Sequence, residues 1–213
     1  MESATRRLWA QQNRHDGDRR RLFTAVRAHA GGEKALYPGS FVDVALSAVY
    51  PAVTYVDMDK RARRFFADTE GVAEIIASMG GRRGASVDFV HADYRGALNL
   101  EHGVFDLLVS LYAGFVSGCC ARYLRTGGAL LVGPSHGDAA MASIDPGYAL
   151  SGVVLSRGGA YRVSTDDLGD YLIPKKPVEL TAEALRERGR GVAYTKSPFA
   201  YLFTKVEGSA PLL

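Results

Sequence analysis

Cysteine is scarce in this chain, with two residues among 213, and the two are adjacent at Cys119 and Cys120. Adjacent cysteines have neither the spacing of a disulfide framework nor the C-x-x-C spacing of a metal site. We therefore expect no metal centre, and we expect a protein of the reducing cytoplasm.

Long hydrophobic runs are also lacking. The longest uncharged stretch, between Asp106 and Arg122, is shorter than the roughly 20 residues that cross a bilayer. The first residues lead into further charge and not into the apolar segment of a secretory signal. These absences predict a soluble protein with no membrane partner, about one domain in length.

The common nucleotide and metalloprotease motifs are missing. The only G-x-G is Gly189-Arg190-Gly191, far from any predicted first strand, and no Gly-Lys pair or H-E-x-x-H is present. These absences disfavour a nicotinamide oxidoreductase, a P-loop enzyme and a zinc protease.

One catalytic pattern matches by its letters, since residues 133–137 read G-x-S-x-G around Ser135. A hydrolase of this type needs a histidine base later in the chain. None of the five histidines follows the motif, and His136, directly beside the serine, is expected to be poorly placed to take its proton. The pattern therefore indicates a plain turn after a strand.

Basic charge is concentrated at the start of the chain. Residues 1–34 carry eight Lys and Arg against four acidic residues, while the rest is close to neutral. Nucleic-acid binding usually needs a broader basic face with interleaved aromatics. We expect a solvated helical arm near an anionic substrate or cofactor, not a nucleic-acid site.

Short apolar runs alternate with helical patterns over the first two thirds of the chain. Buried strands are predicted at 35–37, 53–56, 87–91, 105–111 and 129–132. An amphipathic helix precedes the first strand and ends at Gly31-Gly32, a basic helical segment follows the second, and a helix through Cys119, Cys120 and Leu124 precedes the turn 126–128. This alternation predicts an α/β fold with a mostly parallel sheet and helices on both faces.

The last third has a different pattern. Residues 148–155 and 161–164, joined by Gly158-Gly159, suggest antiparallel strands, and 199–206 suggests a final strand. Thr181 is expected to cap a short helix over 182–188 that ends at Gly189.

Ligands of parallel α/β sheets bind beyond the carboxyl ends of the strands, and acidic residues occupy two of these positions. Asp57 follows the second strand at about the interval from Gly39 at which a carboxylate reaches ribose hydroxyls, although Asp57 and Asp59 also suit helix capping. Asp93 follows the third strand and either accepts from an adenine amino group or caps a turn.

These segments resemble the class I S-adenosylmethionine-dependent methyltransferase family. The similar stretches are residues 35–40, 55–59, 92–94 and 105–110, and, most specifically, the turn and strand of residues 123–132. The resemblance implies a Rossmann-like domain over residues 34–213, preceded by a basic arm or lid over residues 1–33. It also implies S-adenosyl-L-methionine as the cofactor and a small-molecule methyl acceptor.

The loop after the first strand departs from the family pattern of acid-x-Gly-x-Gly-x-Gly. Tyr37 stands at the acid position, and only Gly39 remains of the glycines, with Phe41 and Asp43 in place of others. We expect Ser40 or Asp43 to hold the amino-acid end of the cofactor. The cofactor-binding residues implied by the resemblance are Tyr37, Gly39, Ser40, Asp43, Asp57, Met58, Asp93, Tyr94 and Ser110.

Methyl transfer needs an aligned nucleophile, and a base only where the acceptor loses a proton. Tyr112 and His136 follow strands and are the candidate catalytic residues. The departing first loop keeps two alternatives open: non-methylating chemistry, in which the sulfonium is cyclised or cleaved, and a binding or scaffold protein without turnover.

Overall fold

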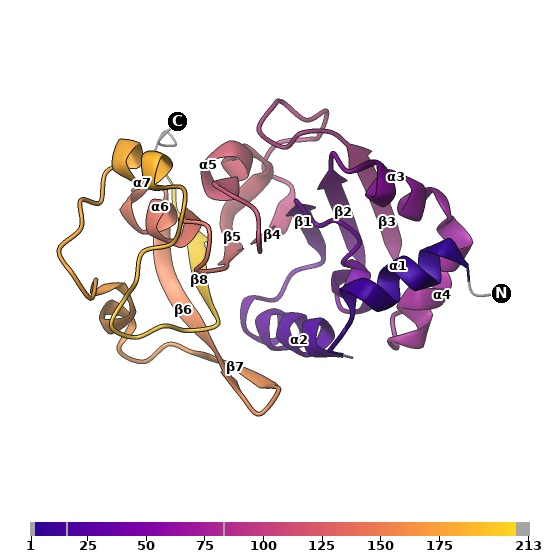
Figure 1. Cartoon of the computed structure of the whole chain (residues 1–213), viewed down its shortest axis with the longest axis horizontal. Coiled ribbons are helices and arrows are strands. Elements are labelled where there is room, and N and C mark those ends of the chain that lie inside the picture. The colour runs from indigo at the N-terminus through magenta and orange to yellow at the C-terminus, as the bar shows by residue number, and fades with distance from the viewer. Residues whose placement is uncertain (1–2, 16, 83, 208–213) are drawn as a thin grey trace.

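Eight strands form one mixed sheet in the computed structural model, which describes residues 3–15, 17–82 and 84–207 (Figure 1). The strands are β1 (Lys34–Pro38), β2 (Ala52–Asp57), β3 (Ser86–His91), β4 (Phe105–Ser110), β5 (Leu124–Val132), β6 (Tyr148–Arg157), β7 (Ala160–Ser164) and β8 (Ala200–Lys205). Their order across the sheet is β3-β2-β1-β4-β5-β8-β6-β7. The first five are parallel, and β8 runs antiparallel between β5 and β6. This confirms the predicted Rossmann-like sheet with an antiparallel C-terminal strand.

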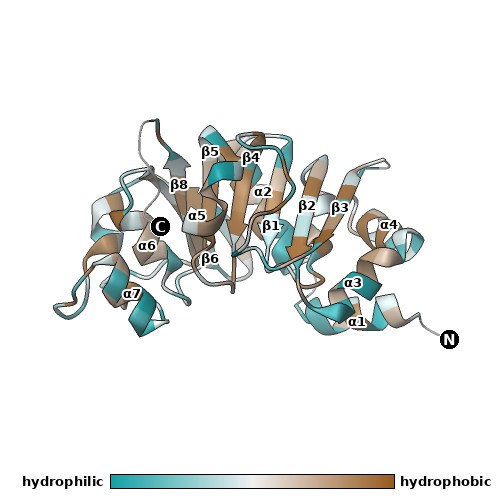
Figure 2. Cartoon of the chain, turned by 90° about the horizontal axis from the view of Figure 1, so that it is seen from above, coloured by the Kyte–Doolittle hydropathy of each residue, from teal (hydrophilic) through white to brown (hydrophobic). Residues whose placement is uncertain are grey.

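Helices cover both faces of the sheet, as predicted. They are α1 (Ala4–Gln12), α2 (Asp18–Ala30), α3 (Lys60–Ala67), α4 (Thr69–Ser78), α5 (Val116–Cys120), α6 (Asp138–Ile144) and α7 (Ala182–Arg188), with short 3-10 turns at 44–48, 121–123 and 168–172. Neighbouring side chains of β1 point to opposite faces: Ala35 and Tyr37 join the core beneath α1 to α4, whereas Leu36 joins the core beneath α5 to α7. Two buried cores therefore hold the strands in place, and the central strands are coloured hydrophobic along most of their length (Figure 2).

The helix before β1 forms as its periodicity predicts. Leu22, Phe23 and Val26 of α2 are fully buried, and the helix ends at Gly31, whose φ of 67° suits glycine. The Tyr161 hydroxyl of β7 donates to Asp18 at 2.8 Å, which ties α2 to the C-terminal hairpin. The role of residues 1–33 as a lid remains a prediction.

The helical segment after β2 is divided at Asp68. The Asp68 carboxylate accepts from the backbone N–H of Gly71 at 3.0 Å and so begins α4, with Asp68 as the single residue between α3 and α4. The same carboxylate accepts from the Thr5 hydroxyl at 2.5 Å, and Trp9 is buried against the core. These contacts fix α1, a helix that the sequence analysis did not predict, alongside α3 and α4 (Figure 1).

The segment before the fifth strand differs from its prediction. The helix ends at Cys120, and Leu124, which was placed in that helix, begins β5 opposite Phe105. The expected turn at 126–128 is an irregularity inside β5, because the register moves from the Phe105–Leu124 pair directly to the Leu107–Ala129 pair. Gly127 has a φ of 74°, which explains the turn-like sequence.

The C-terminal third follows its prediction closely. β6, β7 and β8 are antiparallel strands, and α7 has both of the expected ends. The Thr181 hydroxyl accepts from the N–H of Ala184 at 3.2 Å, and Gly189 is left-handed. Within the described ranges, no helix is long and apolar enough to cross a membrane.

Candidate functional site

A cavity of about 360 Å³ opens at the carboxyl ends of β1, β2, β3 and β4. Its walls come from the four loops that follow these strands. The lining residues are Gly39, Asp57, Met58, Ala92, Asp93, Tyr94, Tyr112, Ala113 and Gly114. Six of them, Gly39, Asp57, Met58, Asp93, Tyr94 and Tyr112, are residues that the sequence analysis named.

The loop after β1 lies directly on the loop after β4. Gly39 has a φ of 65°, and a Cβ built there would stand 2.7 Å from the Cβ of Ala113. Its N–H donates to the carbonyl of Val56 at 2.8 Å. Glycine is required here for two reasons, the left-handed backbone and the close approach of the second loop.

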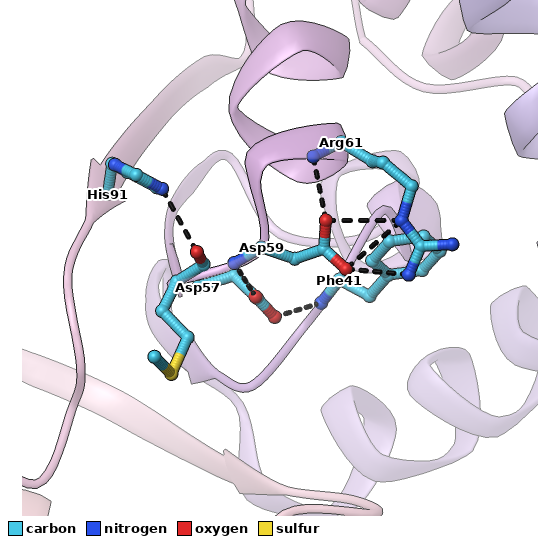
Figure 3. A network of polar contacts seen from close by, with 6 residues as sticks. Phe41, Asp57, Asp59, Arg61 and His91 are labelled. Atoms are coloured by element: carbon cyan, nitrogen blue, oxygen red, sulfur yellow. Dashed lines mark hydrogen bonds and ion pairs between the residues drawn. The ribbon is translucent and has the colours of Figure 1, made fainter.

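Asp57 is held by two backbone donors at the end of β2 (Figure 3). Oδ2 accepts from the N–H of Phe41 and Oδ1 accepts from the N–H of Asp59, both at 2.8 Å. A carboxylate oxygen has two acceptor positions, so each oxygen retains one for a ligand hydroxyl. Phe41 itself has a φ of 49°, an uncommon value for a bulky residue. Residues in such conformations cluster at functional sites.

Asp59 belongs to the helix that follows, as the capping interpretation requires. Its carboxylate accepts from the backbone N–H of Arg61 at 2.7 Å and forms an ion pair with the Arg61 guanidinium at 2.6 Å (Figure 3). These hydrogen bonds hold the pKa of Asp59 below its usual value. The guanidinium also lies 4.8 Å from the centre of the Phe41 ring, so this arginine connects α3 to the loop after β1.

Asp93 forms a similar arrangement at the end of β3. Arg95 donates to it from the backbone N–H at 3.0 Å and from the guanidinium, with the shortest contact at 2.5 Å. These bonds lower the pKa of Asp93. Tyr94, between the two, donates its hydroxyl to the carbonyl of Gly114 at 2.9 Å and so joins the third and fourth loops.

Four of the expected cofactor residues lie behind the cavity wall. Tyr37, Ser40, Asp43 and Ser110 are each at most 2% exposed. The Tyr37 hydroxyl donates to Asp43 at 3.2 Å, and Arg19 of α2 lies 3.4 Å from the same carboxylate. Burial raises the pKa of Asp43, and the positive charge of Arg19 opposes this effect.

Arg19 is a site residue that the sequence analysis did not single out. Its guanidinium carbon stands 4.8 Å from the centre of the Tyr112 ring, at the rim of the cavity. Its Nη1 is buried and has no hydrogen-bond partner among the described residues. A buried donor without a partner is rare and costly in folded proteins. The only sequence signal was its place in the basic N-terminal segment.

Tyr112 and His136, the candidate catalytic residues, lie together at the mouth of the cavity. Tyr112 is 61% exposed, with a left-handed backbone, and its ring centre is 6.5 Å from that of His136. His136 was expected to be poorly placed to take the proton of Ser135. The structure corrects this expectation, because Nδ1 of His136 lies 2.7 Å from the serine oxygen, within hydrogen-bond distance.

Asp138 is a further buried residue beside this site that the sequence did not indicate. It is 1% exposed and accepts from the hydroxyls of Ser110, at 2.5 Å, and Ser117, and from the N–H of Ser117 at 3.0 Å. Burial raises its pKa while these hydrogen bonds oppose the rise. Asp138 thus joins the end of β4 to the starts of α5 and α6.

No family model matches the chain, and no curated protein sequence matches it. Solved structures do match. The O-methyltransferase TomG from Streptomyces achromogenes, in complex with SAM, is 15% identical, with 98% of this chain and 92% of that one covered and a TM-score of 0.47. An O-methyltransferase from Bacillus cereus in complex with SAH is 10% identical, with 76% and 89% covered and a TM-score of 0.49.

A methyltransferase from Geobacter sulfurreducens is 13% identical, with 76% of this chain and 90% of that chain covered and a TM-score of 0.47. The fold assignment rests on the strand order and directions given above. The fold is that of the class I methyltransferases.

Proposed function

We propose that this protein binds S-adenosyl-L-methionine in the cavity at the ends of β1 to β4 and methylates a small molecule. The observation that carries the proposal is the position of Asp57. Asp57 lines the cavity at the end of β2. Two backbone N–H groups hold its carboxylate in place, and each carboxylate oxygen keeps one acceptor position for a ligand. A carboxylate at this place in a Rossmann-like sheet binds the hydroxyls of a nucleotide ribose.

The adenine end of the ligand is assigned to the neighbouring loops. Met58 is 63% exposed at the rim of the cavity and offers an apolar surface to a planar ring. Asp93 would accept from the adenine amino group once Arg95, whose side chain is 68% exposed, turns out into solvent.

The amino-acid end of the ligand is assigned to the side of the cavity where Arg19 lies. The Nη1 of Arg19, which has no hydrogen-bond partner among the described residues, fits a carboxylate, because guanidinium groups bind carboxylates through paired donors. Ser40 and Asp43 remain the proposed partners of the amino group, and Tyr37 holds Asp43 in position. Because both lie behind the cavity wall, this contact requires the loop after β1 to open around the ligand.

S-adenosylmethionine supplies an electrophilic methyl group bound to a positively charged sulfur. Tyr112 presents an electron-rich ring at the mouth of the cavity, which suits a neighbouring cation. His136, beside it, is the proposed base for an acceptor that must lose a proton.

Product analysis separates this function from its alternatives. The purified protein is incubated with S-adenosylmethionine and a panel of phenols, amines and carboxylic acids, and the products are identified by mass spectrometry. Formation of S-adenosylhomocysteine together with a methylated acceptor supports the proposal. Release of cleaved or cyclised fragments of the cofactor would instead support non-methylating chemistry, and binding without any product would support a scaffold.

A further inference from the structure

A fixed loop joins β5 to α6 over residues 133–137, and the proposed function uses a single residue of it. The N–H of Gly133 donates to the carbonyl of Ser110, at the end of β4, at 2.9 Å. The carbonyl of Ser135 accepts from the N–H of Gly191 at 2.8 Å. Gly191 follows α7, which lies beside α6 (Figure 1). Two other segments of the chain therefore hold this loop in place.

The buried carboxylate of Asp138 anchors the loop where α6 begins. One oxygen accepts from the Ser110 hydroxyl at 2.5 Å, and the other accepts from the Ser117 hydroxyl. Within the described part of the chain, Asp138 is bonded to these serines and not to the ring of His136, two residues before it. Another group therefore holds that ring.

Ser135 is the residue that contacts the ring of His136. Its hydroxyl oxygen lies 2.7 Å from Nδ1, which is the only hydrogen bond of this ring with residues that the structure describes. The Tyr112 ring stands edge-on to the imidazole, at 88° and with 6.5 Å between the ring centres. Ser135 is exposed, so its own hydroxyl hydrogen can bond to water, whereas His136 is half-buried. The serine and the tyrosine together fix the plane of the imidazole.

The contact with Ser135 determines which ring nitrogen is available to a substrate. A neutral imidazole carries one proton, and the hydrogen bond made by one nitrogen sets the state of the other. Because Ser135 covers Nδ1, Nε2 is the nitrogen left to exchange a proton. Nε2 acts as a base only when the ring proton is on Nδ1, and Nδ1–H then donates to the serine oxygen. The same hydrogen bond persists when Nε2 becomes protonated, because both nitrogens then carry hydrogen.

We infer that Ser135 is a positioning residue that holds His136 with its proton on Nδ1 and leaves Nε2 as the base, an assignment that rests on the proposed function. In the transfer step the acceptor atom bonds to the methyl carbon, and the methyl–sulfur bond breaks with its electron pair left on sulfur. The proton of the acceptor moves to Nε2. Without the serine, the ring would also populate the Nε2–H form, in which Nε2 is a donor and cannot accept this proton.

Ser135 is not assigned as a nucleophile, although residues 133–137 match the letters of a hydrolase turn. A nucleophilic serine is activated by a histidine that a third group orients in turn. Among the residues that the structure describes, no such third group bonds to His136, and the carboxylate of Asp138 is engaged by Ser110 and Ser117. The geometry therefore favours a positioning role.

The test reads the tautomer of His136 directly. The full chain is labelled with ¹⁵N-histidine, and NMR spectra that correlate the ring protons with both nitrogens are recorded at pH 8.5 without cofactor. His136→Gln removes the signal of this ring and so identifies it. We expect the proton on Nδ1 in the natural chain and in Ser135→Thr, and both tautomers in Ser135→Ala. Ser197→Ala, at an exposed serine in the segment before β8, is the matched control and should leave the tautomer unchanged.

Turnover gives the second measurement. With an acceptor that is methylated, Ser135→Ala should lower kcat at least tenfold without changing KM for S-adenosylmethionine, and Ser135→Thr should restore most of the rate. Absence of methyl transfer by the natural chain would contradict the proposed function, whereas the spectra decide the role of Ser135 by themselves. A proton on Nε2 in the natural chain, or an unchanged tautomer in Ser135→Ala, would overturn the inference. Covalent labelling of Ser135 by a fluorophosphonate, lost in His136→Gln, would also overturn it, because the serine would then be a nucleophile.

Discussion

Gly39 and Ala113 bring two loops into contact at the floor of the candidate site, where a Cβ at residue 39 would stand 2.7 Å from that of Ala113. One loop follows β1 and the other follows β4. Their contact sets the width of the cavity between them. The first loop therefore still approaches the second closely at Gly39, although it lacks the other glycines of the family pattern.

Gly39→Ala should therefore destabilise the protein by more than the cost of a left-handed alanine alone, which is roughly 1–2 kcal/mol. The extra cost is the clash with Ala113, and Gly39→Ala/Ala113→Gly should recover that part only. The measurement is urea unfolding. Gly114→Ala is the matched control, since nothing lies within 4 Å of a Cβ at residue 114. Equal stability of the single and double variants would show that the loops do not meet as described.

Arg19 is expected to contact the amino-acid end of the ligand and not its adenosine end. Arg19→Met should weaken S-adenosylhomocysteine binding at least tenfold, because a carboxylate loses its guanidinium partner, while adenosine, which lacks the carboxylate, should bind as before. Both affinities are measured by calorimetry.

The same substitution leaves Asp43 buried without its cation, which typically costs about 3–5 kcal/mol. Arg19→Met/Asp43→Asn should recover part of this stability without recovering affinity for S-adenosylhomocysteine. Loss of adenosine affinity in the double variant would mean that Arg19 only supports the fold.

Arg95 is expected to compete with the ligand for Asp93. Removing the competitor in Arg95→Ala should strengthen S-adenosylhomocysteine binding by up to about fivefold, since exposed ion pairs are worth about 0.2–1 kcal/mol. Arg122→Ala, at another exposed arginine, serves as the control. Weaker binding in Arg95→Ala would indicate that the arginine itself contacts the ligand.

Asp106 gives a prediction about pH. Burial acts to raise its pKa, but hydrogen bonds from the N–H groups of Lys34 and Glu33 and from Arg125 outweigh burial, and the pKa is lowered. The unfolded chain then binds the proton more tightly than the folded one, so the stabilisation is present above the unfolded pKa of about 3.9 and is lost as the pH falls through the folded value.

Asp106→Asn should consequently lower the free energy of unfolding at pH 7 by about 1.5–3 kcal/mol, the range for hydrogen bonds to a charged group. The difference from the natural chain should shrink as the pH falls below 4. Urea unfolding of both proteins at pH 7, 5 and 3.5 measures this difference. A difference that stays constant with pH would contradict the lowered pKa of Asp106.

Local patterns were sufficient to predict most of the sheet. The strand runs are short, apolar and separated by turn residues, and the acids at 57 and 93 follow two of them directly. In a parallel sheet the carboxyl ends of the strands all lie at the same end of the sheet, so these two acids must lie there together. The cavity does contain Asp57 and Asp93 as lining residues.

The parts that could not be predicted depend on contacts between distant residues. Arg19 meets Asp43 only after α2 has packed on the sheet, and Asp138 meets Ser110 and Ser117 through three separate elements. Helix α1 has few apolar residues, and it is held by contacts with Asp68 and Glu74. The spacing of apolar residues along the chain carries no information about such pairs.

Isothermal titration with S-adenosylhomocysteine measures directly whether the cavity holds S-adenosylmethionine through Asp57. We expect one site per chain and an affinity at least tenfold weaker in Asp57→Ala but unchanged in Asp88→Ala, an exposed acid within β3; the melting temperature should also rise with ligand concentration. Absence of binding by the folded natural chain, or equal affinity in Asp57→Ala, would show that Asp57 does not hold the ligand.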